Sequence, residues 1–376
     1  MSFDPVELAV PGVRGLAPYE PGKPIETLAR EYGLDPASIV KLASNENPRG
    51  PSPRAIEAAR DAIGSVHRYP DGAATELRAR LAARHGVDPG QITVGNGSND
   101  VLDMIARAFL GPGRSAVFSR HAFAVYPIAT RLTGAEARVA APRPADDPAA
   151  PYGHDLDALA ASIGDDTRVV FVANPNNPTG TWLDGGSLRA FLERLPAHVI
   201  AVVDEAYFEC ADVEGYPDAS AWLDALPNLV VTRSFSKVHG LAGLRCGYAV
   251  SSTAIADLLN RVRHPFNANS AALAAAVAAL DDEAFLAESV AINRAGRERL
   301  TQGLRALGLA PIPSAGNFVT VDVGRDAAPV YEALLREGVI VRPVAGYEMP
   351  DHLRISVGVQ PENDRLLAAL ERVLQA

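Results

Sequence analysis

The chain has few cysteines and no excess of positive charge, and each shortage excludes a class of function. Cys210 and Cys246 are the only cysteines among 376 residues, too few for a disulfide framework or a cysteine metal site. Buried free thiols in a reducing cytoplasm are favoured, with a single bridge as the open alternative. The formal net charge is -10 at pH 7, so neither nucleic acid nor an anionic membrane is an expected partner. An anion site must therefore be a local cluster of positive charge.

Targeting signals and long apolar runs are also missing. The first ten residues contain Asp4 and Glu7 and have no basic segment followed by an apolar one, so no signal peptide is expected. The alanine-rich stretch 271–280 is shorter than the ~18 apolar residues that a membrane span needs. We therefore expect a cytoplasmic protein without a membrane partner and without a metal. Its length exceeds the ~250–300 residues at which a single core stops growing, so two domains are expected.

Strands and helices alternate between residues 92 and 250. Short apolar runs predict strands at 92–94, 115–118, 136–140, 169–173, 199–203, 229–232 and 246–250. Helices are predicted at 99–109, 124–132 and 186–195, after helices at 52–63 and 73–85. This alternation predicts an α/β fold whose mostly parallel sheet is sandwiched by helices. Its ligand site should lie at the carboxyl ends of the strands.

The pattern changes after residue 269. A helical stretch at 270–307, broken near residue 281, is followed by strands at 318–321, 340–342 and 353–357 and helices at 328–337 and 361–375. These elements predict a smaller α+β domain. Residues 1–23, rich in proline and glycine, predict an extended arm, followed by helices at 24–33 and 36–41. We expect a discontinuous small domain of 24–55 and 281–376, and a large domain of 56–280.

One predicted strand runs into two serines and a lysine. Ser234, Ser236 and Lys237 follow the strand at 229–232, and Arg245 comes eight residues after the lysine. Two hydroxyls and a guanidinium can hold a phosphate, and a lysine beside them can form a Schiff base with an aldehyde. Pyridoxal phosphate (PLP) requires this combination. Taken alone, the string also fits a surface turn with a solvated arginine.

The glycine-rich loop 95–100 opens a helix after another strand. Ser98 and Asn99 lie at the helix start, where free N–H groups and the positive end of the dipole favour an anion. The loop lacks the spacing of a dinucleotide-binding motif, so NAD is not expected. An ordinary glycine turn with a serine or asparagine cap is the alternative for this loop.

Two further polar strings follow strands. Asp204 comes directly after an apolar run, and a partly buried carboxylate needs a cationic partner such as a protonated pyridine nitrogen. Tyr207 can reach the phenolic oxygen of the same ring. Asn177 lies in the loop 174–180, where prolines fix the backbone, although a rigid turn also fits this loop. Because these strings all end strands of one sheet, they predict a single PLP site.

With these motifs the chain resembles the fold type I PLP-dependent aminotransferases over nearly its whole length, and within them it is most similar to the histidinol-phosphate aminotransferases. The strings that carry the resemblance are KLASNENP at 41–48, RYPD at 68–71, NPNNPTG at 174–180, DEAY at 204–207, the segment 236–247, PFN at 265–267, GNF at 316–318, VRP at 341–343 and LRISVG at 353–358. The resemblance implies a seven-stranded type of sheet, PLP as cofactor and a homodimer.

The resemblance also implies roles for individual residues. Lys237 forms the Schiff base and carries the proton, Asp204 pairs with the ring nitrogen, and Asn177 and Tyr207 bind the ring oxygen. Phe123 stacks on the ring where many relatives have tyrosine, although a core aromatic is the alternative. The cofactor phosphate is held by Ser98, Asn99, Ser234, Ser236 and Arg245, and by Tyr69 of the neighbouring subunit.

The substrate residues are implied in the same way. Arg354 binds the carboxylate of the amino donor through a bidentate contact. Arg342 and Tyr19 are candidates for the substrate phosphate, and Asn45 is a further substrate-binding candidate. A solvated charge at a strand end is the alternative for Arg342. The histidines at 67, 121, 239 and 264 are interpreted as structural, since lysine carries the proton.

The implied reaction is amino transfer between glutamate and histidinol phosphate by two half-reactions, as in histidine biosynthesis. The alternatives are an aromatic (phenylpyruvate) aminotransferase and, further away, a threonine-phosphate decarboxylase. A PLP-binding transcriptional regulator is disfavoured, because only about 40 residues precede the motif at 41–48 and no basic helix-turn-helix is found. The preferred substrate side chain stays open at this point.

Overall fold

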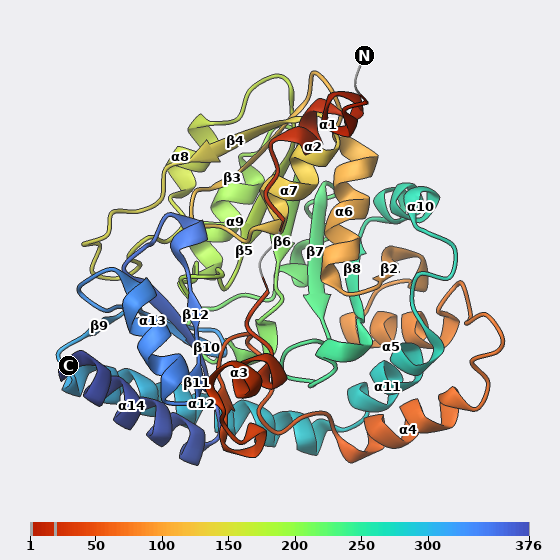
Figure 1. The fold of residues 1–376 in the computed structure, drawn as a ribbon. Coiled ribbons are helices and arrows are strands. Elements are labelled where there is room, and N and C mark those ends of the chain that lie inside the picture. Colours follow the sequence, from red (N-terminus) through yellow and green to blue (C-terminus); the bar gives the residue numbers. More distant parts are fainter. Residues whose placement is uncertain (1–2, 19–20, 376) are drawn as a thin grey trace.

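The computed structural model describes residues 3–18 and 21–375, and a seven-stranded sheet forms its centre (Figure 1). The strand order is β2-β8-β7-β6-β5-β3-β4. Strand β8 is antiparallel to both of its neighbours and the other four pairs are parallel, which confirms the predicted mostly parallel sheet. The strands are β2 Ile92–Gly95, β3 Ser115–Ser119, β4 Glu136–Ala140, β5 Thr167–Ala173, β6 Ile200–Asp204, β7 Leu229–Ser234 and β8 Gly247–Ser251.

Helices cover both faces of this sheet because successive strand residues point to opposite sides. In β5, Val170 and Val172 join one apolar cluster, whereas Val169 and Phe171 join the other. The first cluster includes residues of α4 Pro53–Ile63, α5 Thr75–His85, α8 Leu156–Ala161, α9 Gly185–Glu193 and α11 Ser270–Leu280. The second includes residues of α6 Ser98–Phe109, α7 Val125–Leu132 and α10 Thr253–Val262. Both faces of the sheet are therefore covered by apolar side chains, which leaves the ends of its strands for polar loops.

A smaller unit is built on a four-stranded sheet of order β12-β13-β10-β9 (Figure 1). Its apolar cluster joins the sheet to three helices, α12 Glu283–Ala306, α13 Ala327–Arg336 and α14 Gln360–Gln375. The strands are β9 Ala310–Pro311, β10 Phe318–Asp322, β12 Arg342–Pro343 and β13 His352–Ser356. The break between α11 and α12 at residues 281–282 agrees with the sequence prediction.

The N-terminal part of the chain packs on this smaller unit. Strand β1 Val40–Lys41 pairs in parallel with β11 Val339–Ile340. Leu28 of α3 Ile25–Tyr32 lies in an apolar cluster with Leu335 and Ile340. The discontinuous small domain and the boundaries 24–55, 56–280 and 281–376 stay a prediction.

Three local predictions were wrong. The arm 1–23 is not simply extended, because α1 Pro5–Leu8 and α2 Pro11–Arg14 each begin with a proline, whose φ suits the first helical position. Residues 36–41 form a short 3-10 helix, Pro36–Ser38, and then β1, because the β-branched pair at 39–40 favours a strand. The strand predicted at 340–342 is divided between two sheets, since Ile340 pairs with Lys41 and Arg342 pairs with Arg354.

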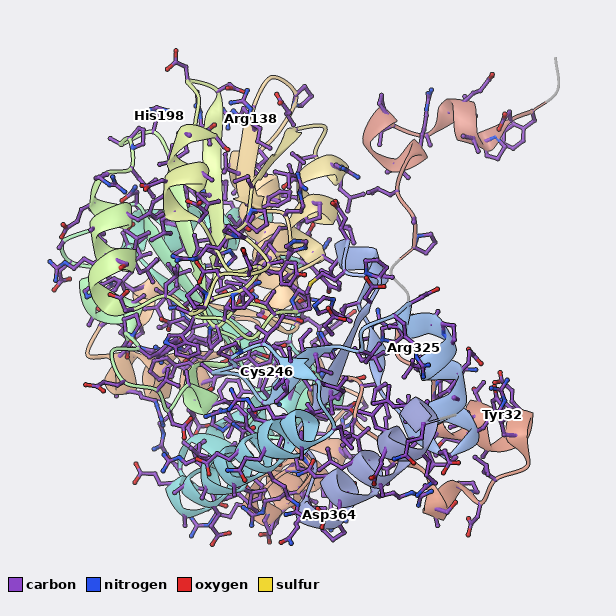
Figure 2. All side chains as sticks on the ribbon, turned by 90° about the vertical axis from the view of Figure 1, so that its left-hand side faces the viewer. Tyr32, Arg138, His198, Cys246, Arg325 and Asp364 are labelled. Atoms are coloured by element: carbon purple, nitrogen blue, oxygen red, sulfur yellow. The ribbon has the colours of Figure 1, made fainter. Side chains whose placement is uncertain are left out.

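The first two helices form an arm on the surface of the molecule, where α2 contacts α7. Phe3 and Leu8 are exposed on it. Cys246 lies in the interior (Figure 2), and both cysteines are buried and unbridged, as predicted. Within the described ranges no helix is long and apolar enough to cross a membrane.

Candidate active site

A cavity of about 480 Å³ opens at the carboxyl ends of β5, β6 and β7. The sequence predicted that residues from separate loops meet here, and most of them line this one cavity. They are Asn45, Ser98, Asn99, Phe123, Asn177, Asp204, Tyr207, Ser234, Ser236, Lys237, Arg245, Arg342 and Arg354. The four histidines interpreted as structural are not among its lining residues.

One corner of the cavity is built to hold an anion. Gly97 precedes α6 with a φ of 85°, and no side chain caps the helix start, so its first N–H groups face outward. A Cβ atom at position 97 would lie 2.6 Å from Arg245 Nη2, so only glycine lets the guanidinium come this close. Arg245 Nη1 donates to Ser236 Oγ over 3.3 Å. The helix start, the guanidinium and the hydroxyls of Ser234 and Ser236 therefore surround one small space.

Asp204 ends β6 and is buried against hydroxyl groups. Tyr126 Oη donates to Asp204 Oδ2 over 2.9 Å, and Thr232 Oγ1 donates to Oδ1 over 2.9 Å. Burial raises the pKa of Asp204, whereas the bonds from Tyr126 and Thr232 act to lower it. A cationic N–H group in the cavity would offset the cost of burying this charge.

Lys237 lies three residues after the end of β7 and also lines the cavity. Its Nζ lies 5.4 Å from the centre of the Tyr207 ring. The backbone before it is fixed, since the N–H of Ser236 donates to Ser234 Oγ over 3.0 Å. Burial raises the pKa of Tyr207 to about 12, so its hydroxyl keeps a proton near neutral pH. The amine and the phenol therefore share one wall of the cavity.

The cavity also joins segments that are far apart in the sequence. Asn45 Nδ2 donates to Tyr207 Oη over 2.9 Å. Arg354 Nη1 donates to Asn177 Oδ1 over 2.5 Å, and its Nη2 donates to the carbonyl of Ala43 over 2.8 Å. Arg354 Nε is buried and has no hydrogen-bond partner. This guanidinium therefore keeps an unsatisfied donor beside the cavity.

One predicted residue that the structure describes does not line the cavity. Tyr69 is exposed on the surface and stacks on Phe266, with ring centres 4.5 Å apart. Its contact with the cofactor phosphate of a neighbouring subunit stays a prediction. Tyr19 lies outside the described residues.

Sequence reasoning missed Tyr126, Thr232 and the apolar wall of Val125 and Ile128. Tyr126 lies three positions after Phe123, and its ring packs edge-on against that of Phe123, with centres 5.9 Å apart. The available signal was a second aromatic residue three positions after Phe123, at the start of α7. Val125 and Ile128 line the cavity from α7. They offered no signal of their own, because apolar helix residues are ordinary core residues.

Known proteins match the chain over nearly all of its length. A curated relative named histidinol-phosphate aminotransferase 2, from Pseudomonas aeruginosa, is 59% identical over 99% of each chain. A relative of the same name from Methylococcus capsulatus is 59% identical over 98% of each chain. The crystal structure of histidinol-phosphate aminotransferase from Sinorhizobium meliloti in complex with pyridoxal-5'-phosphate superposes with a TM-score of 0.87. It is 31% identical and covers 98% of this chain and 97% of that one.

The family model that describes aminotransferase class I and II matches residues 37–370. This range includes every cavity residue discussed above, from Asn45 at its start to Arg354 near its end. The chain therefore belongs to the class I and II aminotransferases.

Proposed function

We propose that this chain is a histidinol-phosphate aminotransferase that uses PLP. It transfers the amino group of glutamate to imidazole-acetol phosphate, which yields 2-oxoglutarate and histidinol phosphate. The observation that carries this proposal is the 59% identity, over 99% of both chains, with a relative of that name. The cavity supports the proposal independently, because its polar groups suit this cofactor.

The residues present fit PLP at each of its polar groups. The start of α6, Arg245 and the two serines suit a phosphate. The buried Asp204 suits the ring nitrogen, and Asn177 and Tyr207 suit the ring oxygen. Phe123 is half-buried on the cavity wall, where an aromatic face can cover the ring. When bound, PLP supplies an aldehyde that takes up the amino group and a protonated ring that withdraws electrons from the substrate Cα.

The protein residues then divide the work. Lys237 Nζ takes the proton from the substrate Cα, acting as the general base, and later returns a proton as the acid. Asp204 keeps the ring nitrogen protonated, since its negative charge favours the pyridinium form. The wall of Val125 and Ile128 excludes water and gives an imidazole ring an apolar surface.

The two arginines at the substrate end favour an anionic substrate. Arg354 suits the carboxylate of glutamate, because a guanidinium can hold a carboxylate through two parallel bonds. Arg342 lines the same cavity and suits the phosphate of histidinol phosphate. An aromatic amino acid is the second candidate substrate, since Val125 and Ile128 would also accept a phenyl ring.

We also propose that the enzyme is a cytoplasmic homodimer. Tyr69 and Phe266 form an exposed aromatic pair, with 81% and 45% of their surfaces exposed. Aromatic surfaces of this kind are enriched at protein interfaces. Tyr69 would then reach the phosphate corner of the partner's cavity.

Steady-state kinetics test the substrate. With 2-oxoglutarate as acceptor, kcat/KM is expected to be higher for histidinol phosphate than for phenylalanine. Arg342→Gln is the matched variant, and it should lower kcat/KM for histidinol phosphate by about 10- to 100-fold because a charge-assisted contact is lost. Its kcat/KM for phenylalanine should not change. A higher kcat/KM for phenylalanine in the unmodified enzyme would overturn the proposed substrate.

A further inference from the structure

Asp204 accepts a hydroxyl hydrogen bond on each of its two carboxylate oxygens. Thr232 lies directly beside it, because β6 and β7 pair in parallel with these two residues in register. Tyr126 reaches it from α7, which covers one face of the sheet. Both donor–acceptor distances are 2.9 Å. Two elements that meet only in the folded chain therefore fix the direction of this carboxylate.

Three aromatic rings hold the ring of Tyr126. Phe171 stacks on it with centres 4.7 Å apart and planes 7° apart, while Phe123 and Phe118 contact it at 5.9 and 6.3 Å. Tyr126 is fully buried and is not among the residues that line the cavity. Its hydroxyl thus has a fixed position, and the effect of this hydroxyl on a ligand passes through Asp204, to which it donates.

The surroundings of Tyr126 also keep its hydroxyl protonated, so that it remains a hydrogen-bond donor. Burial, together with the nearby charge of Asp204, raises the pKa of Tyr126 well above its ordinary value, so the phenol keeps its proton. Burial raises the pKa of Asp204, and the bonds from the two hydroxyls oppose this effect because they favour the ionised carboxylate. Removal of a hydroxyl should therefore make Asp204 easier to protonate.

We propose that Tyr126, assisted by Thr232, is a positioning residue that keeps Asp204 ionised and directed at the ring nitrogen of bound PLP. An ionised carboxylate has about four acceptor sites, so both oxygens can still accept the ring N–H. The proposal rests on the PLP site of the proposed function. It adds two hydrogen bonds within the protein, whose effect on PLP affinity can be measured without turnover.

The test compares two ligands on the cofactor-free protein. Tyr126→Phe removes the hydroxyl and leaves the ring packed against Phe171. Its affinity for PLP should fall about tenfold, the loss of one hydrogen bond to a charged group. Its affinity for the 1-deaza analogue, in which C–H replaces the ring nitrogen, should change less than about twofold, because that analogue presents no N–H to Asp204. Equal losses for both ligands would show a merely structural role and overturn the proposal.

Matched variants complete the test. Tyr248→Phe removes another buried hydroxyl, which bonds to His85 Nε2 over 3.0 Å, and should leave both affinities unchanged. Thr232→Val removes the bond to Oδ1 without altering the aromatic cluster, and it should weaken PLP selectively even if Tyr126→Phe does not fold. In an Asp204→Asn background, Tyr126→Phe should cause no further loss.

A pH series separates this inference from the proposed function. As the pH is lowered, PLP binding to Tyr126→Phe should begin to weaken at a higher pH than PLP binding to the unmodified protein. The reason is that Asp204 takes up a proton more readily in the variant. If the unmodified protein does not bind PLP, the proposed function fails. If it binds PLP and neither Tyr126→Phe nor Thr232→Val weakens that binding selectively, only the role of Tyr126 and Thr232 fails.

Discussion

The cofactor end and the substrate end of the cavity join chain segments of very different separation. At the cofactor end, Arg245 and Ser236 are 9 residues apart, and Asp204 and Thr232 are 28 apart. At the substrate end, Asn45 and Tyr207 are 162 residues apart and Arg354 and Asn177 are 177 apart. The first set belongs to neighbouring strands and loops of one sheet. The second set exists only where two parts of the fold meet.

This difference suggests that the cofactor end mainly sets the rate of the chemical step and the substrate end mainly sets substrate affinity. The cofactor end is held by strand pairing, so its geometry is set by the large sheet. The substrate end combines β13, the loop after β1 and the loop after β5, so its contacts depend on how the smaller unit sits against the sheet. Changes at the first end should lower kcat, whereas changes at the second should raise KM.

The largest effect is expected at Lys237. Lys237→Ala removes the amine to which we assign both the bond to the cofactor aldehyde and the transfer of the proton. We expect transamination to fall by at least about 10⁴-fold, as for the loss of a general acid–base residue. The visible absorbance band of the bound cofactor should shift to that of a free aldehyde. Unimpaired turnover of glutamate would contradict the role assigned to this residue.

A smaller but still large effect is expected at Asp204. Asp204→Asn keeps the size of the side chain and removes the charge that, in our proposal, holds the ring nitrogen protonated. We expect kcat to fall roughly 10²-fold, the scale of losing one electrostatic contact in a buried site. The KM for glutamate should change little, and stopped-flow absorbance of the first half-reaction would measure the slowed step. A change in the KM for glutamate without a change in kcat would contradict the assignment of kcat effects to the cofactor end.

Arg354 tests the substrate end. Arg354→Gln should raise the KM for glutamate about 10- to 100-fold, because a charge-assisted bidentate contact is lost. The affinity for PLP should stay within about twofold of the unmodified enzyme. Arg354→Lys is the control, and we expect it to restore only part of the affinity, since lysine cannot form the bidentate contact. An unchanged glutamate KM in Arg354→Gln would remove the residue from this role.

The smallest effect concerns stability at the cofactor end. His154 is buried, its Nε2 donates to the carbonyl of Ala173 at the end of β5, and burial lowers its pKa to about 4. Because the unfolded chain binds a proton near pH 6.5 and the folded chain does not, stability from this group is present above pH 6.5. It is lost as the pH falls toward 4, by about 1.4 kcal/mol per pH unit.

Urea unfolding of His154→Gln at pH 7 and pH 5.5 checks this prediction. The variant should be less stable at pH 7 but should lose about 1 kcal/mol less than the unmodified protein between the two pH values. The variant should still lose some stability between pH 7 and pH 5.5, since burial and Arg233 also lower the pKa of His85 to about 4. Parallel pH dependences would show that His154 does not titrate in this way.

Most of the fold followed from local pattern. Apolar runs separated by helical segments predicted the seven strands of the sheet within about two residues at most ends. The prediction failed at 36–41 and 340–342, where β1 and β11 pair with each other across almost 300 residues. Two-residue strands are too short to leave a pattern, so only their partner decides them. The helices α8 and α10 were also missed, and α8, with only six residues, is too short to show a clear helical period.

The sequence by itself determined the cofactor end of the site. Ser98, Asn177, Asp204 and Lys237 each follow a strand, and parallel strands place their carboxyl ends at one edge, so their meeting could be predicted from order alone. Tertiary structure alone decided that Tyr126 bonds to Asp204 and that Arg354 bonds to Asn177. These contacts need a helix to pack on a sheet and a second unit to dock beside it. Local spacing carries no information about either, because the long-range packing of apolar clusters sets both distances.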